Sequence, residues 1–337
     1  MLILLTILLL VCTSCTSKQQ EATDNHSPLS IGFAQFCHDS AKHASMMALA
    51  APESLHSPLK IVFTGDVLLD RGVRPYAERQ GIPALFAGVD SVFRQADAVV
   101  INLECPLTDT VTPVNKHFVF RGEPQWAKGL REAGITHAAM ANNHTYDQGR
   151  QGLLSTYHHL KEAGIEPLGY GTTKAERLEP VIIRKGTTEV ALFNSVTLPL
   201  ENWYDLDNRP GICQASASTL ADAVRSYRAN HPSTKIIAVL HWGAELQTTP
   251  TMQQRLDAQT LLQAGVDVIV GHHPHVVQPL VNIYGKPVFY SLGNFVFDQS
   301  LPISQKATMA QITIQGDTIL VKSLPVSIVR NKPVIQK

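Results

Sequence analysis

The chain has 337 residues, of which 44% are hydrophobic and 17% are charged. A chain of this length and composition can bury a sizeable core, as one large domain or two modest ones. Lysine plus arginine and aspartate plus glutamate both number 28, so the formal net charge is zero. Because no net field would draw the protein to a polyanion, we expect no nucleic-acid partner.

The first residues have the pattern of an export signal. The apolar run from Leu2 to Val11 is shorter than the roughly 20 residues that a helix needs to span a bilayer, and it suits the hydrophobic region of a signal peptide. Cys15 follows small residues and precedes a polar stretch, as the lipid-attachment cysteine of a bacterial lipoprotein does. We therefore expect a lipoprotein-type signal over residues 1–15 and an exported protein anchored at the membrane of the cell envelope. An ordinary cleaved signal or a misassigned start are the alternatives.

The other cysteines do not have the number or spacing of a disulfide framework or of a cysteine-based zinc site. Apart from Cys12 and Cys15, the chain contains only Cys37, Cys105 and Cys213, without a Cys-x-x-Cys spacing. A dense disulfide network is excluded, and a cysteine-based zinc site is not expected.

The rest of the chain alternates predicted strands and helices. Residues 16–57 show no strand pattern and read as a leader or tether. An ordered domain is expected over 58–330, followed by a tail over 331–337. Apolar, β-branched runs predict strands within 60–64, 96–107, 136–149, 235–243, 266–275 and 286–298. Helical periodicity predicts helices within 81–96, 124–134, 150–165, 220–232 and 252–265. Residues 181–196 and 309–329 predict two hairpins.

Metal-binding residue types follow the apolar part of several predicted strands. In an open α/β sheet the strand ends form the ligand crevice, so residues far apart in sequence meet there. Carboxylate, amide and imidazole donors suit Zn, Mn or Fe. The pattern therefore predicts a site for one or two divalent ions of unknown identity. Its candidate residues are Asp66, Glu104, Asn143, His144, His241, His272, His273 and His275.

Each candidate also has a purely structural explanation. Asp66 could be a turn residue or a helix N-cap, and Asn143 could be a turn former. His241 could be a packed core histidine. His144 could cap the following helix, and Asp147 could be a residue of the turn before it. The segment GHHPH could be a loop with partly exposed imidazoles. The coincidence of residue type and position at several strand ends favours the metal site.

Seven motifs together resemble one known family. In chain order they are GDVLLDRG, NLECPLT, ANNHTYDQG, GYG, HWGAELQTTPTMQQ, GHHPHVVQ and YSLGNFVFD. They resemble the motifs of the CapA family of capsule or poly-γ-glutamate biosynthesis proteins, over about residues 60–329. That family is similar in fold to the calcineurin-like metallophosphoesterases. The resemblance implies an α/β fold, a four-layer α/β/β/α sandwich with metals at the carboxyl ends of strands.

The resemblance also implies roles for single residues. Asp66 resembles the first metal-ligand aspartate, and Glu104 takes the place of the aspartate that bridges two metals. Asn143 resembles the metal-binding asparagine, with His144 as its catalytic companion. His241 resembles the lone histidine ligand.

Three departures from the phosphoesterase pattern point to a weakened or single-metal site. Asp66 is followed by Val67 and Leu68, so the expected Asp-x-His imidazole is missing. The bridging residue is a glutamate, and GHHPH is one residue longer than Gly-His-x-His. His273 and His275 keep the i, i+2 spacing and are taken as ligands, which leaves His272 as a supporting or substrate contact.

Further residues are candidates for chemistry around the metal. His144 is expected to protonate the leaving group. Arg71 is expected to clamp an anionic substrate group through its planar guanidinium, with a structural ion pair as the alternative. Asn294 could support the site by hydrogen bonding or simply form a turn. Asn102 and Glu245 lie in the matching motifs and are candidates for supporting or substrate contacts.

Two functions fit these observations. The first is a metal-dependent hydrolase or transferase that acts on a phosphoester or on an amide or ester bond of a capsule-type polymer. The second is a non-catalytic, lipid-anchored assembly or export factor that binds an anionic polymer or a capsule synthesis partner. Fold alone does not decide between them.

Overall fold

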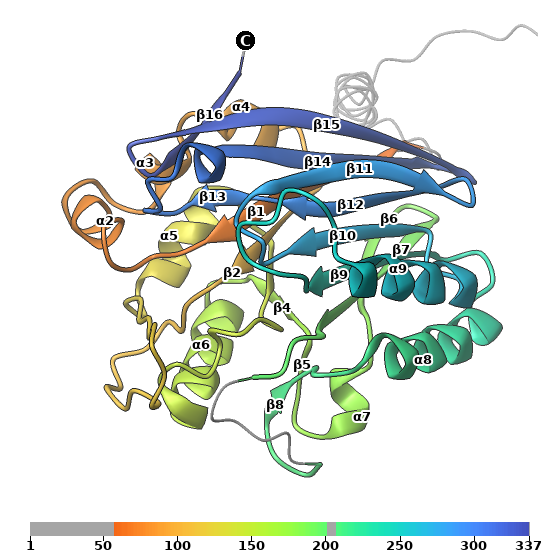
Figure 1. Cartoon of the computed structure of the whole chain (residues 1–337), viewed down its shortest axis with the longest axis horizontal. Coiled ribbons are helices and arrows are strands. Elements are labelled where there is room, and N and C mark those ends of the chain that lie inside the picture. Colours follow the sequence, from red (N-terminus) through yellow and green to blue (C-terminus); the bar gives the residue numbers. More distant parts are fainter. Residues whose placement is uncertain (1–56, 201–206, 337) are drawn as a thin grey trace, which may run out of the picture. The chain divides into compact units, whose positions relative to one another are not determined.

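The computed structural model describes residues 57–200 and 207–336, which form one compact unit (Figure 1). The expected signal peptide and nearly all of the expected tether lie outside the described residues. Within the described residues, the helices are too short or too polar to cross a membrane. Two β-sheets form the centre of the unit, and most of its helices pack on their outer faces.

The larger sheet has eight strands. In spatial order these are β16 (Lys332–Ile335), β15 (Thr318–Val329), β14 (Lys306–Gln315), β1 (Leu59–Val67), β2 (Ala98–Leu103), β3 (His137–Ala139) and β4 (Glu166–Leu168), with β13 (Asn294–Val296) also pairing with β1. Strands β1 to β4 are parallel neighbours, whereas β14 to β16 pair antiparallel. Because β16 pairs with β15, the sheet extends into residues that the sequence analysis placed in a tail.

The smaller of the two central sheets has six strands. In spatial order these are β11 (Val277–Ile283), β12 (Lys286–Leu292), β10 (Val268–His272), β9 (Lys235–His241), β7 (Thr188–Val196) and β6 (Val181–Lys185). Its four inner strands are parallel, and its two edge strands are antiparallel to their neighbours. Strand β11 contains Pro279, which an edge strand tolerates and a central strand does not. A separate pair joins β5 (Tyr170–Gly171) to β8 (Gly211–Ile212).

Helices cover the outer face of each sheet. The larger sheet packs against α2 (Arg74–Gln80), α3 (Pro83–Phe86), α4 (Asp90–Phe93), α5 (Trp126–Glu132) and α6 (Gly149–Glu162). The smaller sheet packs against α8 (Ala217–Asn230) and α9 (Met252–Ala264), and the short α7 (Lys174–Arg177) and η1 (Pro302–Gln305) lie in connections. The single helix expected over 81–96 is instead the pair α3 and α4. They are separated near Gly88, where a Cβ would lie 2.5 Å from the backbone oxygen of Pro333.

Alternating side chains of β1 show why both of its faces are buried. Ile61 and Phe63 belong to the core between the two sheets, while Val62 belongs to the core beneath the helices. This period of two is that of a strand buried on both sides. A third core lies between the smaller sheet and its helices. The layers therefore run α/β/β/α, and the expected fold class is confirmed.

The chain crosses from one sheet to the other where β1 and β12 end. The chain leaves β12 of the smaller sheet at Gly293, which has a φ of 74°, and enters β13 of the larger sheet one residue later. Gly65 packs against this crossover so closely that a Cβ would lie 1.9 Å from the Gly293 oxygen. The amide of Asp66 donates to the same oxygen at 3.0 Å. The crossover thus fixes the position of Asp66.

Candidate metal centre

Two buried carboxylates lie side by side at the ends of β1 and β2. The parallel register places Asp66 opposite Asn102, and Glu104 follows directly after β2. The Nδ2 of Asn102 donates to Asp66 Oδ1 at 2.8 Å and to Glu104 Oε2 at 3.3 Å. The other two oxygens, Asp66 Oδ2 and Glu104 Oε1, are buried and accept no hydrogen bond from the described residues. Buried acceptors without a donor are costly, so this pair favours a positive partner, either a proton or a cation.

His275 supplies an imidazole beside both carboxylates. Its Nδ1 lies 2.9 Å from Asn294 Oδ1 and 3.2 Å from Asp66 Oδ2, and its Nε2 lies 3.5 Å from Glu104 Oε1. The Nδ2 of Asn294 donates to Gln299 Oε1 at 2.9 Å, so the Oδ1 of Asn294 faces the imidazole. In the neutral ring, which is the form that binds a metal, Nδ1 therefore carries the proton and Nε2 the lone pair. Asn294 thus orients His275, as the sequence analysis considered.

Asn143, His241 and His273 line the adjoining part of the site. The Oδ1 of Asn143 lies 2.9 Å from His241 Nε2, and the rings of His241 and His273 are 4.8 Å apart. Nδ1 of His273 is buried and has no hydrogen-bond partner among the described residues. His273 and His275 both have a positive φ, 98° and 57°. Non-glycine residues adopt this conformation at a cost, and such strain concentrates at functional sites.

His272 points away from the carboxylates. Its Nε2 lies 2.9 Å from the backbone oxygen of Thr64, so the imidazole links β10 of the smaller sheet to β1 of the larger. Burial lowers its pKa. The three neighbouring histidines thus divide into one that joins the sheets and two, His273 and His275, that lie at the site.

The pKa values in the site follow from burial and from the close charges. Burial and the charge of Asp66 raise the pKa of Glu104 well above its usual range. Burial would also raise the pKa of Asp66, but the imidazole of His275, 3.2 Å from Asp66 Oδ2, and the nearby His272 lower it. Burial opposes protonation of His275, yet the charges of Glu104 and Asp66 raise its pKa to about 9. Burial lowers the pKa of His273 to about 3 and that of His241 well below its usual value.

His144 forms a pair with Asp147 at the rim of the carboxylates. Nδ1 of the imidazole donates to Asp147 Oδ2 at 2.7 Å, and its Nε2 lies 4.0 Å from Glu104 Oε1. The ring stacks on Phe120 at a centroid distance of 4.1 Å. Burial lowers the pKa of His144 despite the opposing effect of Asp147. The resting imidazole is therefore neutral, with the lone pair on Nε2.

Lys116 was not anticipated from the sequence. Its Nζ donates to Asp147 Oδ1 at 2.8 Å and to the backbone oxygen of Asn143 at 2.7 Å. The contact ties the His144–Asp147 pair to the loop between β2 and α5. Residues 109–119 carry no strand or helix pattern, so the sequence offered no signal for this lysine. The sequence analysis treated Asp147 only as a residue of a turn. Its position three residues after His144 is the signal that could have identified the pair.

A pocket of about 270 Å³ opens onto the site, and its lining includes Lys116, Asn143, His144, Glu245 and His273. Arg71 does not line it. The Arg71 guanidinium is paired with Asp298 and lies near the rings of Phe118, Phe120 and Phe297. Its position corresponds to the structural ion pair that was the alternative to an anion clamp.

The fold and the donors together define the class of this protein. The chain is a four-layer α/β/β/α sandwich that carries carboxylate, amide and imidazole groups at the ends of its strands. Residues 60–299 match the family described as "Bacterial capsule synthesis protein PGA_cap". The chain therefore belongs to this family of bacterial capsule synthesis proteins, and the resemblance found from its motifs is confirmed.

Two curated relatives and one solved structure illustrate the similarity. The PGA biosynthesis protein CapA of Bacillus subtilis (strain 168) is 29% identical over 263 residues, which cover 75% of this chain and 67% of the relative. The capsule biosynthesis protein CapA of Bacillus anthracis is 27% identical over 283 residues, covering 82% of this chain and 69% of the relative. The structure of the NAD nucleotidase NadN of Haemophilus influenzae matches with a TM-score of 0.48 and 15% identity, covering 83% of this chain and 60% of NadN.

Proposed function

We propose that the chain is a divalent-metal-dependent hydrolase or transferase of capsule-polymer biosynthesis. Its substrate would be a phosphoester, or an amide or ester bond of an anionic polymer such as poly-γ-glutamate. The observation that carries the proposal is the pair of buried carboxylate oxygens, Asp66 Oδ2 and Glu104 Oε1, that lack a hydrogen-bond donor beside the Nε2 of His275. The names of the relatives, which refer to PGA and capsule biosynthesis, support the choice of polymer.

The residues present fit a divalent cation. Donor atoms of Asp66, Glu104 and His275 lie within 4.8 Å of one another, close enough to share one ion after small side-chain shifts. Asn143 and His241 add an amide oxygen and an imidazole in the adjoining part of the site. This mixture of oxygen and nitrogen donors suits Mn, Zn or Fe, as one ion or two. A bound ion would polarise the oxygen of the scissile group and lower the pKa of a bound water.

The protein's own contribution to the reaction is proton transfer and orientation. Nε2 of His144 can accept the proton of the attacking water, because Asp147 holds the proton on Nδ1. The same nitrogen can then return that proton to the leaving group, which is the role expected for His144 from the sequence. Lys116 holds the Asp147 carboxylate in place.

The first test measures metal and activity together. Purified wild-type protein should contain a divalent metal by elemental analysis and should hydrolyse p-nitrophenyl phosphate or bis-p-nitrophenyl phosphate, or cleave poly-γ-glutamate, with added Mn or Zn. Asp66→Ala and His241→Ala should each lose metal and at least 100-fold in rate, since each removes a donor. His158→Ala, which alters an exposed histidine on α6, is the matched control.

Two results would count against the enzyme. Wild-type protein without bound metal, or Asp66→Ala and His241→Ala variants that behave as wild type, would refute the proposed chemistry. Metal binding without turnover, combined with retention of poly-γ-glutamate in a pull-down, would favour the assembly or export factor instead.

We also propose that the protein is exported and lipid-anchored through Cys15, which lies outside the described residues. The support is the sequence pattern around that cysteine. A fatty-acid probe should label the wild-type protein in the membrane fraction, and the Cys15→Ala variant should lose the label. Cys12→Ala is the control and should keep it. Labelling that persists in Cys15→Ala would contradict the anchor.

A further inference from the structure

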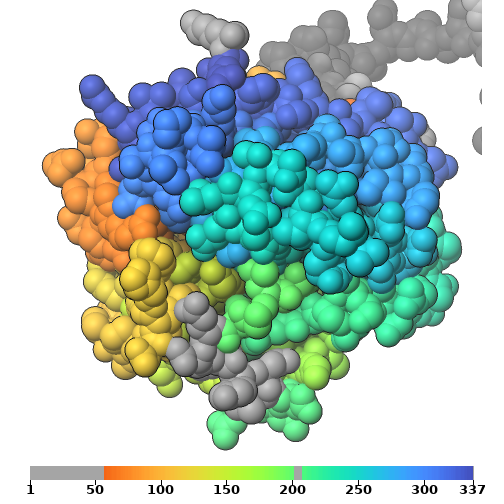
Figure 2. Space-filling model, viewed as in Figure 1, coloured from red at the N-terminus to blue at the C-terminus, as the bar shows by residue number. Residues whose placement is uncertain are grey.

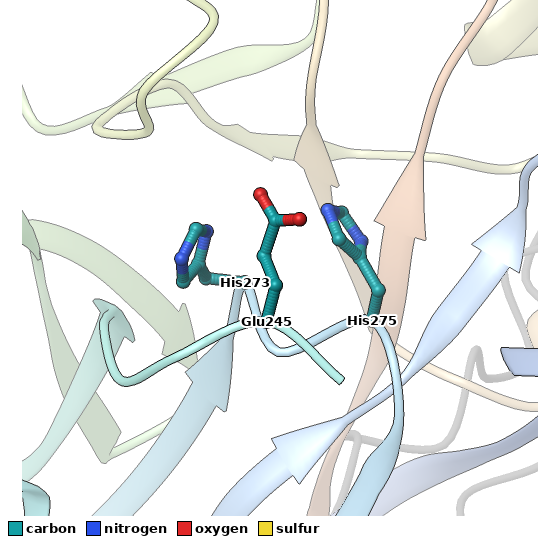
Figure 3. A group of neighbouring side chains, drawn as sticks. All are labelled: Glu245, His273 and His275. Atoms are coloured by element: carbon teal, nitrogen blue, oxygen red, sulfur yellow. The ribbon is translucent and has the colours of Figure 1, made fainter. Parts of the chain in front are cut away.

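The sequence resemblance led us to expect a histidine two residues after Asp66, and β1 and the residues after it carry none there. Glu245 lies beside the two histidines of the site and could supply the missing donor. Donor atoms of Glu245, His273 and His275 lie within 4.8 Å of one another. Figure 3 shows the carboxylate of Glu245 between the two imidazoles. Val67 and Leu68, which follow Asp66, are buried hydrophobic residues and offer no such donor.

The loop that carries Glu245 is exposed, but its backbone is tied to the histidine loop. The amide of Leu246 donates to the Pro274 oxygen at 2.8 Å, directly between His273 and His275 in sequence. On the far side, the Nε2 of Gln278 donates to the Gln247 oxygen at 2.8 Å. Figure 2 shows the teal segment that follows β9 at the surface of the molecule. The backbone therefore holds the Glu245 side chain over the site, although the residue itself is exposed.

His273 is the second observation that points to a ligand at this place. Its side chain is more than nine-tenths buried, and its Nδ1 has no hydrogen-bond partner among the described residues. Its φ of 98° is a conformation that a non-glycine residue adopts only when its surroundings impose it. A buried imidazole nitrogen without a partner is costly, and a cation beside it would remove that cost.

The shared residue His275 decides which ion Glu245 would meet. When His275 gives up a proton to bind an ion, Asn294 keeps the remaining proton on Nδ1, so Nε2 provides the single lone pair of that ring. One lone pair binds one ion. Both groups of donors contain His275: one includes Asp66 and Glu104, and the other includes Glu245 and His273. Because His275 can bind only one ion, we take the two groups as parts of one centre and not as two independent sites.

We propose that Glu245 is a metal ligand of this centre, acting with His273 and His275 and supplying the donor that β1 lacks. This inference rests on the proposed function, because it assumes that the centre binds a divalent cation. A carboxylate in place of a neutral imidazole adds a hard oxygen donor and a negative charge. Such a centre favours Mn over softer alternatives more than an imidazole-rich one would.

The test is titration of Mn²⁺ into the metal-free full-length protein by isothermal titration calorimetry. Glu245→Gln keeps the size of the side chain and removes its charge, and it should weaken Mn²⁺ binding at least tenfold. Glu132→Gln makes the same change at an exposed position on α5 and should bind Mn²⁺ as wild type does. Because Glu245 is exposed, the melting temperature of metal-free Glu245→Gln should equal that of wild type, which separates a lost ligand from a lost fold.

The outcomes distinguish this inference from the function on which it rests. Unchanged Mn²⁺ binding in Glu245→Gln, with binding lost in Asp66→Ala, would overturn the role of Glu245 and leave the metal centre standing. Wild-type protein that binds neither Mn²⁺ nor Zn²⁺ would overturn both.

Discussion

Glu104→Gln is expected to stabilise the metal-free protein at neutral pH and, at the same time, to abolish its stabilisation by a divalent cation. The two opposite effects have one cause. Glu104 is fully buried next to Asp66, so without a cation its charged form is destabilised, and the pKa of its carboxyl is raised well above its usual range. Glutamine keeps the shape of the side chain and removes the charge. Because the Nδ2 of Asn102 donates to one oxygen of residue 104, the amide oxygen takes that position and the NH2 group replaces the oxygen that would bind the ion.

The pH dependence of stability follows from the direction of that shift. Because the folded protein holds the Glu104 proton more tightly than the unfolded chain does, this contribution is complete below the usual glutamate pKa of 4.5. It is lost as the pH rises through the raised pKa of the folded state. His275, whose pKa is raised to about 9, acts in the same direction between pH 6.5 and 9. The stability of metal-free wild-type protein relative to metal-free Glu104→Gln should therefore fall as the pH rises above 4.5, because both proteins share the titration of the other site residues.

The measurement is urea unfolding of metal-free protein between pH 5 and 8, repeated with Mn²⁺. At pH 7 the metal-free Glu104→Gln variant should be more stable than wild type by roughly 1–3 kcal/mol, the usual cost of a poorly satisfied buried polar group. Mn²⁺ at a thousand times its Kd should stabilise wild type by about 4 kcal/mol and the variant by almost nothing. Glu132→Gln should follow wild type in both conditions.

Proton release gives an independent check of the same site. A cation that binds His275 displaces a proton from a group with a pKa of about 9. The affinity for Mn²⁺ should then rise about tenfold per pH unit between pH 6 and 8. If metal-free Glu104→Gln were less stable than wild type at pH 7, the destabilisation assigned to the buried Glu104 charge would be contradicted. If the affinity for Mn²⁺ did not vary with pH, the binding of the ion by His275 would be contradicted.

The strand ends could be read from the sequence because each has a local signature. Asp66 and Glu104 both follow short apolar runs, and in parallel strands such residues meet at one edge. The type and position of these residues were therefore predictable. The i, i+2 spacing favoured His273 and His275 within GHHPH, and these two lie at the site in the structure, but the spacing did not show what holds them there and turns His272 elsewhere. That arrangement depends on the positive φ of His273 and His275 and on the contact of His272 with Thr64, 208 residues away.

Other differences between expectation and structure also depend on distant contacts. Arg71 pairs with Asp298, which is 227 residues further along the chain, so the sequence around Arg71 could not show that its charge was already engaged. The predicted helix over 81–96 is divided near Gly88 because the backbone at Pro333, in β16, packs against that glycine. A local pattern predicts an element, whereas its interruption is determined by a partner elsewhere in the fold.

His144→Asn is expected to lower the turnover number 100- to 10,000-fold while the metal content stays that of wild type. General acid–base catalysis by a positioned side chain contributes a factor of this size. His144 lies beside the carboxylates, with Nε2 4.0 Å from Glu104 Oε1, and its other nitrogen is committed to Asp147. Asparagine retains a polar group at Nδ1 but has no nitrogen at the Nε2 position, so it can neither take nor return the proton.

The pH profile of the rate separates this proton shuttle from a merely structural role. Burial lowers the pKa of His144, so the neutral form that accepts a proton predominates above that pKa and disappears below it. The wild-type rate with bis-p-nitrophenyl phosphate should therefore rise with pH through a value below 6.5, and His144→Asn should remove this rise. Asp147→Asn should also reduce the rate, because the orientation of the ring depends on that carboxylate. His158→Asn is the matched control. A His144→Asn variant with the wild-type profile, or one whose rate loss is explained entirely by lost metal, would show that the imidazole takes no part in the proton transfer.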